Sequence, residues 1–146
     1  MNFSRRRGCK RMNKTQFYLH FETMPKGTAQ QKGVYVRNGK PHFYRKDNVN
    51  SARHKFIIAL RPNKPKIPID KPVRLYLWFA YDVKDKKKWG KYKPTVPDVD
   101  NIAKEFIDSM KAVGYFVDDA VVVDLRVIKS YAEQASIMVQ YEVIEQ

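Results

Sequence analysis

Alternation of apolar and polar residues predicts most of the strands in this chain. The clearest run is VRLYLWFAY, residues 73–81, in which every second residue is apolar and therefore points to one face of a sheet. The aromatic run at 17–22 alternates in the same way, and the apolar runs at 120–131 and 136–144 are typical of two more strands joined by a short turn. The apolar faces of these last two strands offer more than an internal core needs, so some of their residues can also serve an interface with another chain: Val121, Val123, Leu125, Val127, Ile137, Val139 and Tyr141.

A helical period and two turn signals complete the predicted fold. Residues 34–44 form a predicted hairpin, because the Asn-Gly pair at its centre suits a two-residue turn with positive φ. Apolar residues recur at helical spacing over 48–60 and 100–113, and four prolines make 61–72 an extended connection. The pattern predicts an α+β fold, with a mixed β-sheet of four or five strands and two main helices.

Basic residues are concentrated in the first two thirds of the chain. The net charge of the 146 residues is +14, and residues 1–93 carry 25 Lys and Arg against 5 Asp and Glu. This excess predicts attraction to a polyanion, most commonly nucleic acid, although a basic protein without a specific partner is the alternative. Residues 1–14 are expected to form a disordered basic arm and residues 15–146 a single domain.

Several classes of protein are disfavoured by what the sequence lacks. No apolar stretch is long enough to cross a membrane, and the basic N-terminus lacks the apolar run of a secretion signal, so a cytoplasmic location is expected. Cys9 is the single cysteine, which excludes an intrachain disulfide framework and a cysteine-rich zinc cluster. We find no phosphate-binding glycine loop and expect no nucleotide cofactor.

Carboxylates gather where the second helix begins. Asp98 and Asp100 lie two residues apart, and Asp100 is a plausible N-cap for the helix. Asp119 follows the same helix in the segment GYFVDDAVVV, and consecutive elements tend to be neighbours, so the three acids can converge. Lys104 lies one helical turn after Asp100, on the same face.

Three converging carboxylates require a cation. Oxygen ligands without His or Cys favour Mg²⁺, with Mn²⁺ also possible, over zinc, and Mg²⁺ leaves coordination positions for phosphate oxygens. On a basic protein this chemistry points to phosphodiester hydrolysis. An Asp-x-Asp pair is common, however, and solvated capping residues explain it equally well from spacing alone.

The lysine-rich segment KDKKKWGKYK, residues 84–93, leads into these acids. Its lysines can neutralise phosphates, and its aromatic side chains can stack on bases. A solvated loop with aromatic residues anchored in the core is the alternative. The residues predicted to bind nucleic acid are Lys84, Lys86, Lys87, Lys88, Trp89, Lys91 and, on a later strand, Lys129.

The stretch from 97 to 129, PDVDNIAKEFIDSMKAVGYFVDDAVVVDLRVIK, resembles the RusA family of Holliday junction resolvases. The family signature has a P-D-x-D-N opening, a lysine six residues after the first aspartate, a further helix aspartate, a D-D pair and a lysine on the following strand. The matching residues are Asp98, Asp100, Asn101, Lys104, Asp108, Asp118, Asp119 and Lys129.

This resemblance implies a homodimeric, Mg²⁺-dependent endonuclease that resolves four-way DNA junctions by paired symmetric cuts, of a kind common in phages and prophages. It implies that Asp98, Asp100 and Asp119 are metal ligands and that Lys104 contacts the scissile phosphate or the leaving group. Asp118 and Asn101 would support these residues. Two rival readings are a basic nucleic-acid-binding accessory protein without catalysis, and a nuclease that acts mainly on other branched DNA.

Overall fold

The computed structural model describes residues 14–26, 32–45 and 47–146. The predicted basic arm lies outside these residues except for Lys14, which opens the first strand. The strands are β1 (Lys14–Phe21), β2 (Lys32–Arg37), β3 (Lys40–Arg45), β4 (Val73–Asp82), β5 (Val122–Ala132) and β6 (Ala135–Val143). The helices are α1 (Asp47–Leu60) and α2 (Val99–Val113), with short 3-10 turns η2 (Arg61–Asn63), η3 (Lys86–Lys88) and η4 (Asp119–Val121).

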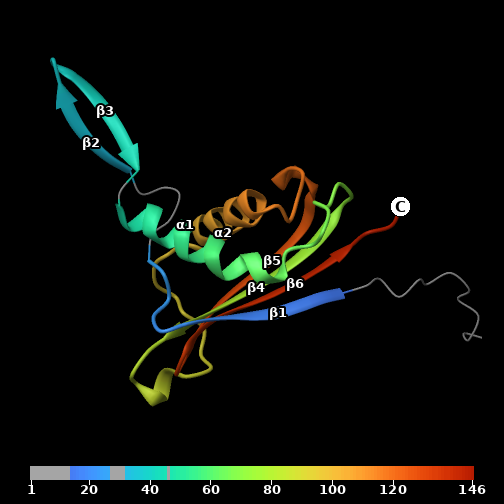
Figure 1. Cartoon of the computed structure of the whole chain (residues 1–146). Helices are drawn as coiled ribbons and strands as arrows, with labels where there is room; N and C mark the ends of the chain where they lie inside the picture. The colour runs from blue at the N-terminus through green and yellow to red at the C-terminus, as the bar shows by residue number, and fades with distance from the viewer. Residues whose placement is uncertain (1–13, 27–31, 46) are drawn as a thin grey trace, which may run out of the picture.

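Four of the strands form one mixed sheet in the order β1-β6-β4-β5 (Figure 1). The β1–β6 and β6–β4 pairs are antiparallel, whereas β4 and β5 are parallel. Parallel neighbours cannot be joined by a tight turn, and here α2 lies in the connection between them. The start of α2 therefore lies near the end of β5, where Lys129 contacts Thr95 and Pro97. The end of α2 lies near the start of β5, where Lys111 pairs with Asp118.

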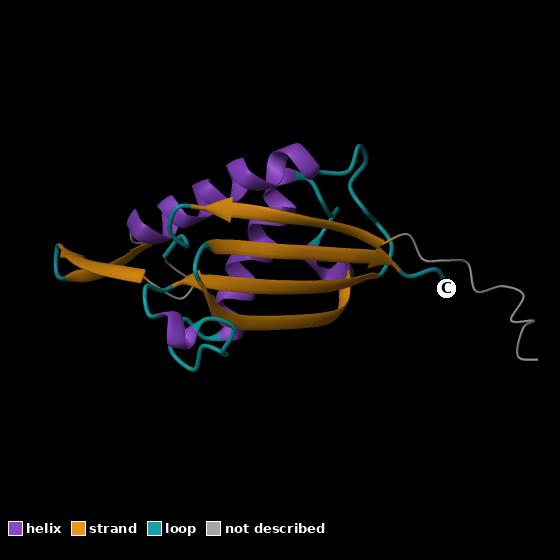
Figure 2. Ribbon diagram, turned by 90° about the horizontal axis from the view of Figure 1, so that it is seen from below, coloured by secondary structure: helices purple, strands orange, loops and turns teal. Residues whose placement is uncertain are grey.

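The core lies between the sheet and the two helices, which cover one face of it (Figure 2). Val73, Leu75, Leu77 and Phe79 of β4 are completely buried, as their alternation predicts. They pack with the apolar stripe of α2. The rings of Phe79 and Phe106 are arranged edge to face there, with their centroids 5.6 Å apart. None of the described helices is long and apolar enough to cross a membrane.

The predicted strands, the hairpin and both helices are confirmed, with boundaries that differ by up to three residues. Val123 and Leu125, two of the residues left open between core and interface, lie outside the core, because their exposed fractions are 60% and 44%. β5 is an edge strand of the sheet, so residues near its start are covered on one side only. As shown below, both line a cavity.

The hairpin of β2 and β3 forms a second, separate two-stranded sheet (Figure 1). Asn38 has a φ of 53° and Gly39 a φ of 72°, the left-handed conformations that a tight two-residue turn requires. The strands pair from Lys32↔Arg45 to Arg37↔Lys40, and the hairpin projects from the body beside the start of α1.

Candidate active site

The acids at the start of α2 do not cap the helix. The N-cap is Asp98, and its side chain makes no capping hydrogen bond, while Asp100 lies inside the first turn. The expectation that Asp100 is the N-cap is therefore wrong. Both carboxylates are exposed beside the positive end of the helix dipole, which stabilises their charge. Helix capping therefore does not explain these two carboxylates, and their oxygen atoms are available to bind a ligand.

A cavity of about 360 Å³ lies between α2, η4 and the start of β5. Asp100, Lys104 and Asp108 line it from α2, because residues four apart share one face of a helix. Asp119 lines it from η4. The remaining wall is formed by Ala103, Ile107, Val122, Val123 and Leu125.

The structure thus brings together three of the four predicted catalytic residues: Asp100, Lys104 and Asp119. Asp98 and Asn101 precede the cavity and do not line it. Within the described ranges, no three His, Cys, Asp or Glu side chains are grouped so as to hold a metal ion by themselves. Two carboxylates of the predicted ligand set, Asp100 and Asp119, therefore line the cavity, and the third, Asp98, is the N-cap residue of α2.

The carboxyl groups of Asp118 and Asp119 shift each other's pKa in opposite directions. A hydrogen bond with Asp118 raises the pKa of the Asp119 carboxyl, and burial and the charges of Asp118 and Asp108 act in the same direction. The same hydrogen bond lowers the pKa of Asp118, helped by Lys111, whose Nζ lies 3.3 Å from Oδ1 of Asp118. Crowded carboxylates of this kind favour either a proton or a nearby cation.

Two lysines hold the segment that leads into α2. Lys129 Nζ donates to the carbonyl oxygens of Thr95 at 2.6 Å and Pro97 at 2.5 Å. Lys93 Nζ donates to Thr95 Oγ1 at 2.6 Å and to the carbonyl oxygen of Val96. Burial, followed by repulsion from Lys93, lowers the pKa of Lys129. Lys129 was predicted to contact nucleic acid, but its ammonium group is directed at the backbone ahead of Asp98.

The lysine-rich segment is attached to the open edge of β5. Gly90 N–H donates to the carbonyl oxygen of Tyr131 at 2.8 Å, and Tyr131 N–H donates to the carbonyl oxygen of Lys91 at 2.9 Å. Trp89 is half-buried and donates from Nε1 to the carbonyl oxygen of Val83 at 2.8 Å, so its indole is anchored to the backbone just after β4. The five lysines predicted to bind nucleic acid here remain exposed: Lys84, Lys86, Lys87, Lys88 and Lys91.

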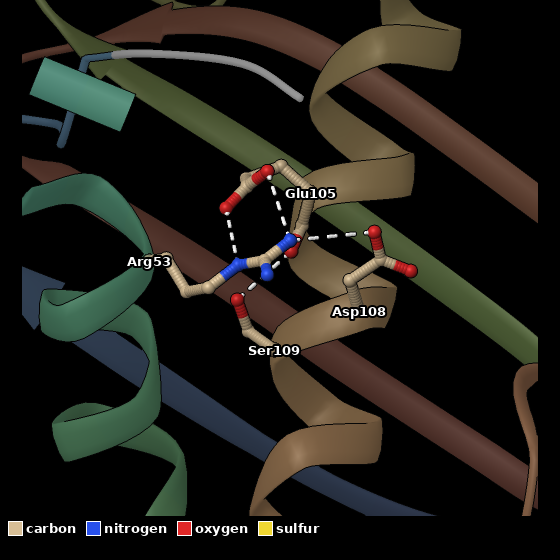
Figure 3. A network of polar contacts seen from close by, with 4 residues as sticks. All are labelled: Arg53, Glu105, Asp108 and Ser109. Atoms are coloured by element: carbon tan, nitrogen blue, oxygen red, sulfur yellow. Dashed lines mark hydrogen bonds and ion pairs between the residues drawn. The ribbon is translucent and has the colours of Figure 1, made fainter. Parts of the chain in front are cut away.

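An ion-pair network behind the cavity was not predicted (Figure 3). Arg53 of α1 donates from Nε to Glu105 Oε1 at 2.8 Å and from Nη2 to Glu105 Oε2 at 3.3 Å. Its Nη2 also lies 3.4 Å from Oδ2 of Asp108, the carboxylate that lines the cavity. Ser109 Oγ donates to the carbonyl oxygen of Glu105 at 2.8 Å. The network therefore ties α1 to the face of α2 that carries the candidate site.

The sequence does carry a signal for this network. Glu105 stands between Ile102 and Phe106, which form the apolar stripe of α2, and its side chain is fully buried. A charged residue inside an apolar stripe requires a partner, and Arg53 sits next to Ala52 of the apolar stripe of α1. Arg53 could be identified as the partner of Glu105 only if α1 were known to pack against α2.

Known proteins resemble this chain over most of its length. Residues 22–142 match the family described as endodeoxyribonuclease RusA. The chain is 35% identical over 129 residues to a crossover junction endodeoxyribonuclease rusA of Lactococcus phage r1t, covering 87% of this chain and 96% of that protein. It is also 30% identical over 141 residues to the uncharacterized protein YqaN of Bacillus subtilis strain 168, covering 88% of this chain and 95% of that one. The chain therefore belongs to the RusA endodeoxyribonuclease family.

Proposed function

We propose that this protein is a metal-dependent endonuclease that resolves four-way DNA junctions by paired, symmetric phosphodiester hydrolysis. The observation that carries the proposal is the shared cavity of Asp100, Lys104 and Asp119 in a chain with a net charge of +14. Carboxylates repel a phosphate backbone, so a protein that only binds DNA gains nothing from directing them into a cavity. The similarity to a phage crossover junction endodeoxyribonuclease supports the choice of substrate.

The donor set of the cavity fits a hard divalent cation such as Mg²⁺ or Mn²⁺. Mg²⁺ keeps several waters and binds through one or two protein carboxylates together with substrate phosphates, and the cavity supplies Asp100 and Asp119. Asp98, with Asn101 and Asp118 in support, would complete the set. When bound, the ion would activate water and neutralise charge that develops at phosphorus.

The remaining side chains have separate tasks in this proposal. Lys104 places an ammonium group in the same cavity, where it can meet the scissile phosphate or the leaving oxygen. The exposed lysines between positions 84 and 91 attract the DNA backbone toward α2. The Lys129 and Lys93 hydrogen bonds hold the 94–98 segment, and thus Asp98, in place.

The proposal is tested with labelled four-way, Y-shaped and linear DNA of matched sequence, each with and without Mg²⁺. We expect symmetric nicks in the four-way junction only when Mg²⁺ is present. An Asp119→Asn preparation controls for contaminating nucleases. Tight binding of the junction without cutting would identify an accessory protein instead, and equal cutting of Y-shaped DNA would identify a general branched-DNA nuclease.

A further inference from the structure

The β2–β3 hairpin lies outside the main sheet. It pairs with none of the four strands of the main sheet, and a lone two-stranded hairpin is marginally stable in water. Among its described side chains, Val36 is 71% exposed and Tyr35 is 49% exposed. A separate element with exposed apolar side chains is well placed to contact an external partner.

One face of the hairpin is cationic and aromatic. Side chains alternate along a strand and paired residues share a face, so the register places Tyr35, Arg37, Lys40 and His42 together. The rings of Tyr35 and His42 stack at 5.1 Å with an interplanar angle of 16°. Arg37 and Lys40 are exposed at the tip, and neither joins a salt bridge among the described residues.

The sequence of the hairpin favours a polyanionic partner. Residues 32–45 contain four basic residues and no Asp or Glu, so acidic side chains do not oppose the charge within the element. A protein partner of ordinary composition would not need this one-sided charge. A nucleic-acid backbone does, because each neutralised phosphate releases a bound counterion.

The position of the hairpin relates it to the candidate site. It leaves the body at the end of the molecule where α1 and α2 both begin, and the lysine-rich segment lies at the same end on the far side of the sheet (Figures 1 and 2). The first turn of α2, with Asp98 and Asp100, lies between these two basic elements. A duplex that crosses this turn would meet both of them.

We propose that the β2–β3 hairpin is a DNA-binding arm whose Arg37 and Lys40 contact phosphates of a duplex arm of the substrate. The inference rests on the proposed function for the identity of that substrate. A two-stranded ribbon fits the major groove of DNA, and the stacked Tyr35–His42 pair stiffens the face that meets it. The hairpin and the lysine-rich segment would then hold the duplex on both sides of the cleavage site.

The test compares two double variants that each remove two positive charges. Arg37→Ala/Lys40→Ala alters the hairpin, and Lys64→Ala/Lys66→Ala alters exposed lysines of the connection that follows α1. Binding to a labelled four-way junction is measured by fluorescence anisotropy in EDTA over about 50 to 200 mM salt. Circular dichroism checks that both variants are folded.

We expect the hairpin variant to reduce the steepness of log K against log salt by about two, since each phosphate contact contributes roughly 0.9. Over this salt range the wild type should therefore lose about tenfold more affinity than the hairpin variant. The control variant should keep the wild-type slope. An unchanged slope in the hairpin variant, or an equal change in both variants, would overturn the proposal. Because no cutting is involved, a wild type that binds junctions but never cleaves them refutes the nuclease and leaves this test intact.

Discussion

Lys129 Nζ lies 2.5 Å from the carbonyl oxygen of Pro97, one residue before the N-cap aspartate of α2. We expect Lys129→Met to slow cleavage by as much as about 100-fold, because a displacement of about 1 Å in a catalytic group costs this much. Junction affinity should change by less than about twofold, since the ammonium group faces the backbone of the protein. Single-turnover cleavage and anisotropy measure the two quantities separately.

Lys91→Met is the matched comparison for this prediction. Lys91 is exposed on the neighbouring segment. Its loss should therefore reduce the slope of log K against log salt by about one and leave the cleavage rate of the saturated enzyme unchanged. Amide hydrogen exchange of residues 94–98 should accelerate in Lys129→Met and not in Lys91→Met. If both variants behave alike, Lys129 is an ordinary phosphate contact.

Arg53→Met is expected to destabilise the fold by about 3 kcal/mol, because it leaves the fully buried carboxylate of Glu105 without its bidentate partner. Urea denaturation measures the free energy of unfolding. Lys55→Met removes an exposed cation from the same helix and should change that free energy by no more than about 0.5 kcal/mol.

The double variant Arg53→Met/Glu105→Leu sharpens this prediction. Replacing both partners of a buried ion pair by apolar residues is often close to neutral, so the double variant should recover most of the lost stability. A double variant that is no more stable than Arg53→Met alone would contradict the view that the loss of the Arg53 ion pair to the buried Glu105 carboxylate causes the destabilisation.

Most of the fold could be predicted from the sequence, because its elements are set by local patterns. The strict alternation over 73–81 and the Asn38-Gly39 turn each specify a structure by themselves. Val123 and Leu125 could not be assigned to the core or to an interface from the sequence, because alternation shows that two residues share a face but not whether another element covers that face. Whether this face of β5 is covered depends on where α2 ends relative to the strand.

The candidate site was predictable in part. The spacing of Asp100 and Lys104 fixes them on one helix face, and the short connection after α2 brings Asp119 to the same cavity. The role of Lys129 was not predictable, because its partners are main-chain carbonyls 32 and 34 residues away. A lysine that binds carbonyl groups and a lysine that binds phosphate are identical in sequence.

Asp98→Asn, Asp100→Asn and Asp119→Asn should each reduce cleavage of a four-way junction by about a thousandfold, or ~4 kcal/mol. Binding measured without Mg²⁺ should remain, since the amide keeps the shape and removes a negative charge. Asp124→Asn is the control: Asp124 lies on β5, pairs with Arg74 at 2.8 Å and does not line the cavity. Cleavage by Asp119→Asn at the rate of Asp124→Asn would remove Asp119 from the site.

Lys104→Ala should lower the cleavage rate at saturation by roughly 100-fold and weaken junction binding only slightly. The side chain lines the cavity with Asp100 and Asp119, where its charge can meet negative charge that develops only in the transition state. Lys64→Ala removes one exposed lysine elsewhere and should change neither quantity. Equal losses in rate and affinity for Lys104→Ala would instead mean that it binds substrate and transition state alike.

The protein is expected to act as a homodimer, for a reason that lies in its substrate. Resolving a four-way junction requires two opposed strands to be cut, and the run of acids from Asp98 to Asp119 occurs once in the sequence. The second set must come from another chain. A two-fold dimer places two sites in the symmetry of the junction itself.

Light scattering gives the mass in solution, and a supercoiled plasmid with an extruded cruciform tests the coordination of the two cuts. Paired cuts within one binding event convert the supercoiled plasmid directly to the linear form, whereas independent cuts pass through a nicked circle. We expect linear product from the first time points with the wild type.

Mixing wild type with excess Asp119→Asn should form dimers with one working site and shift the product to nicked circles. A monomer in solution that yields only nicked circles would contradict paired cleavage and favour a nuclease that cuts branched DNA one strand at a time.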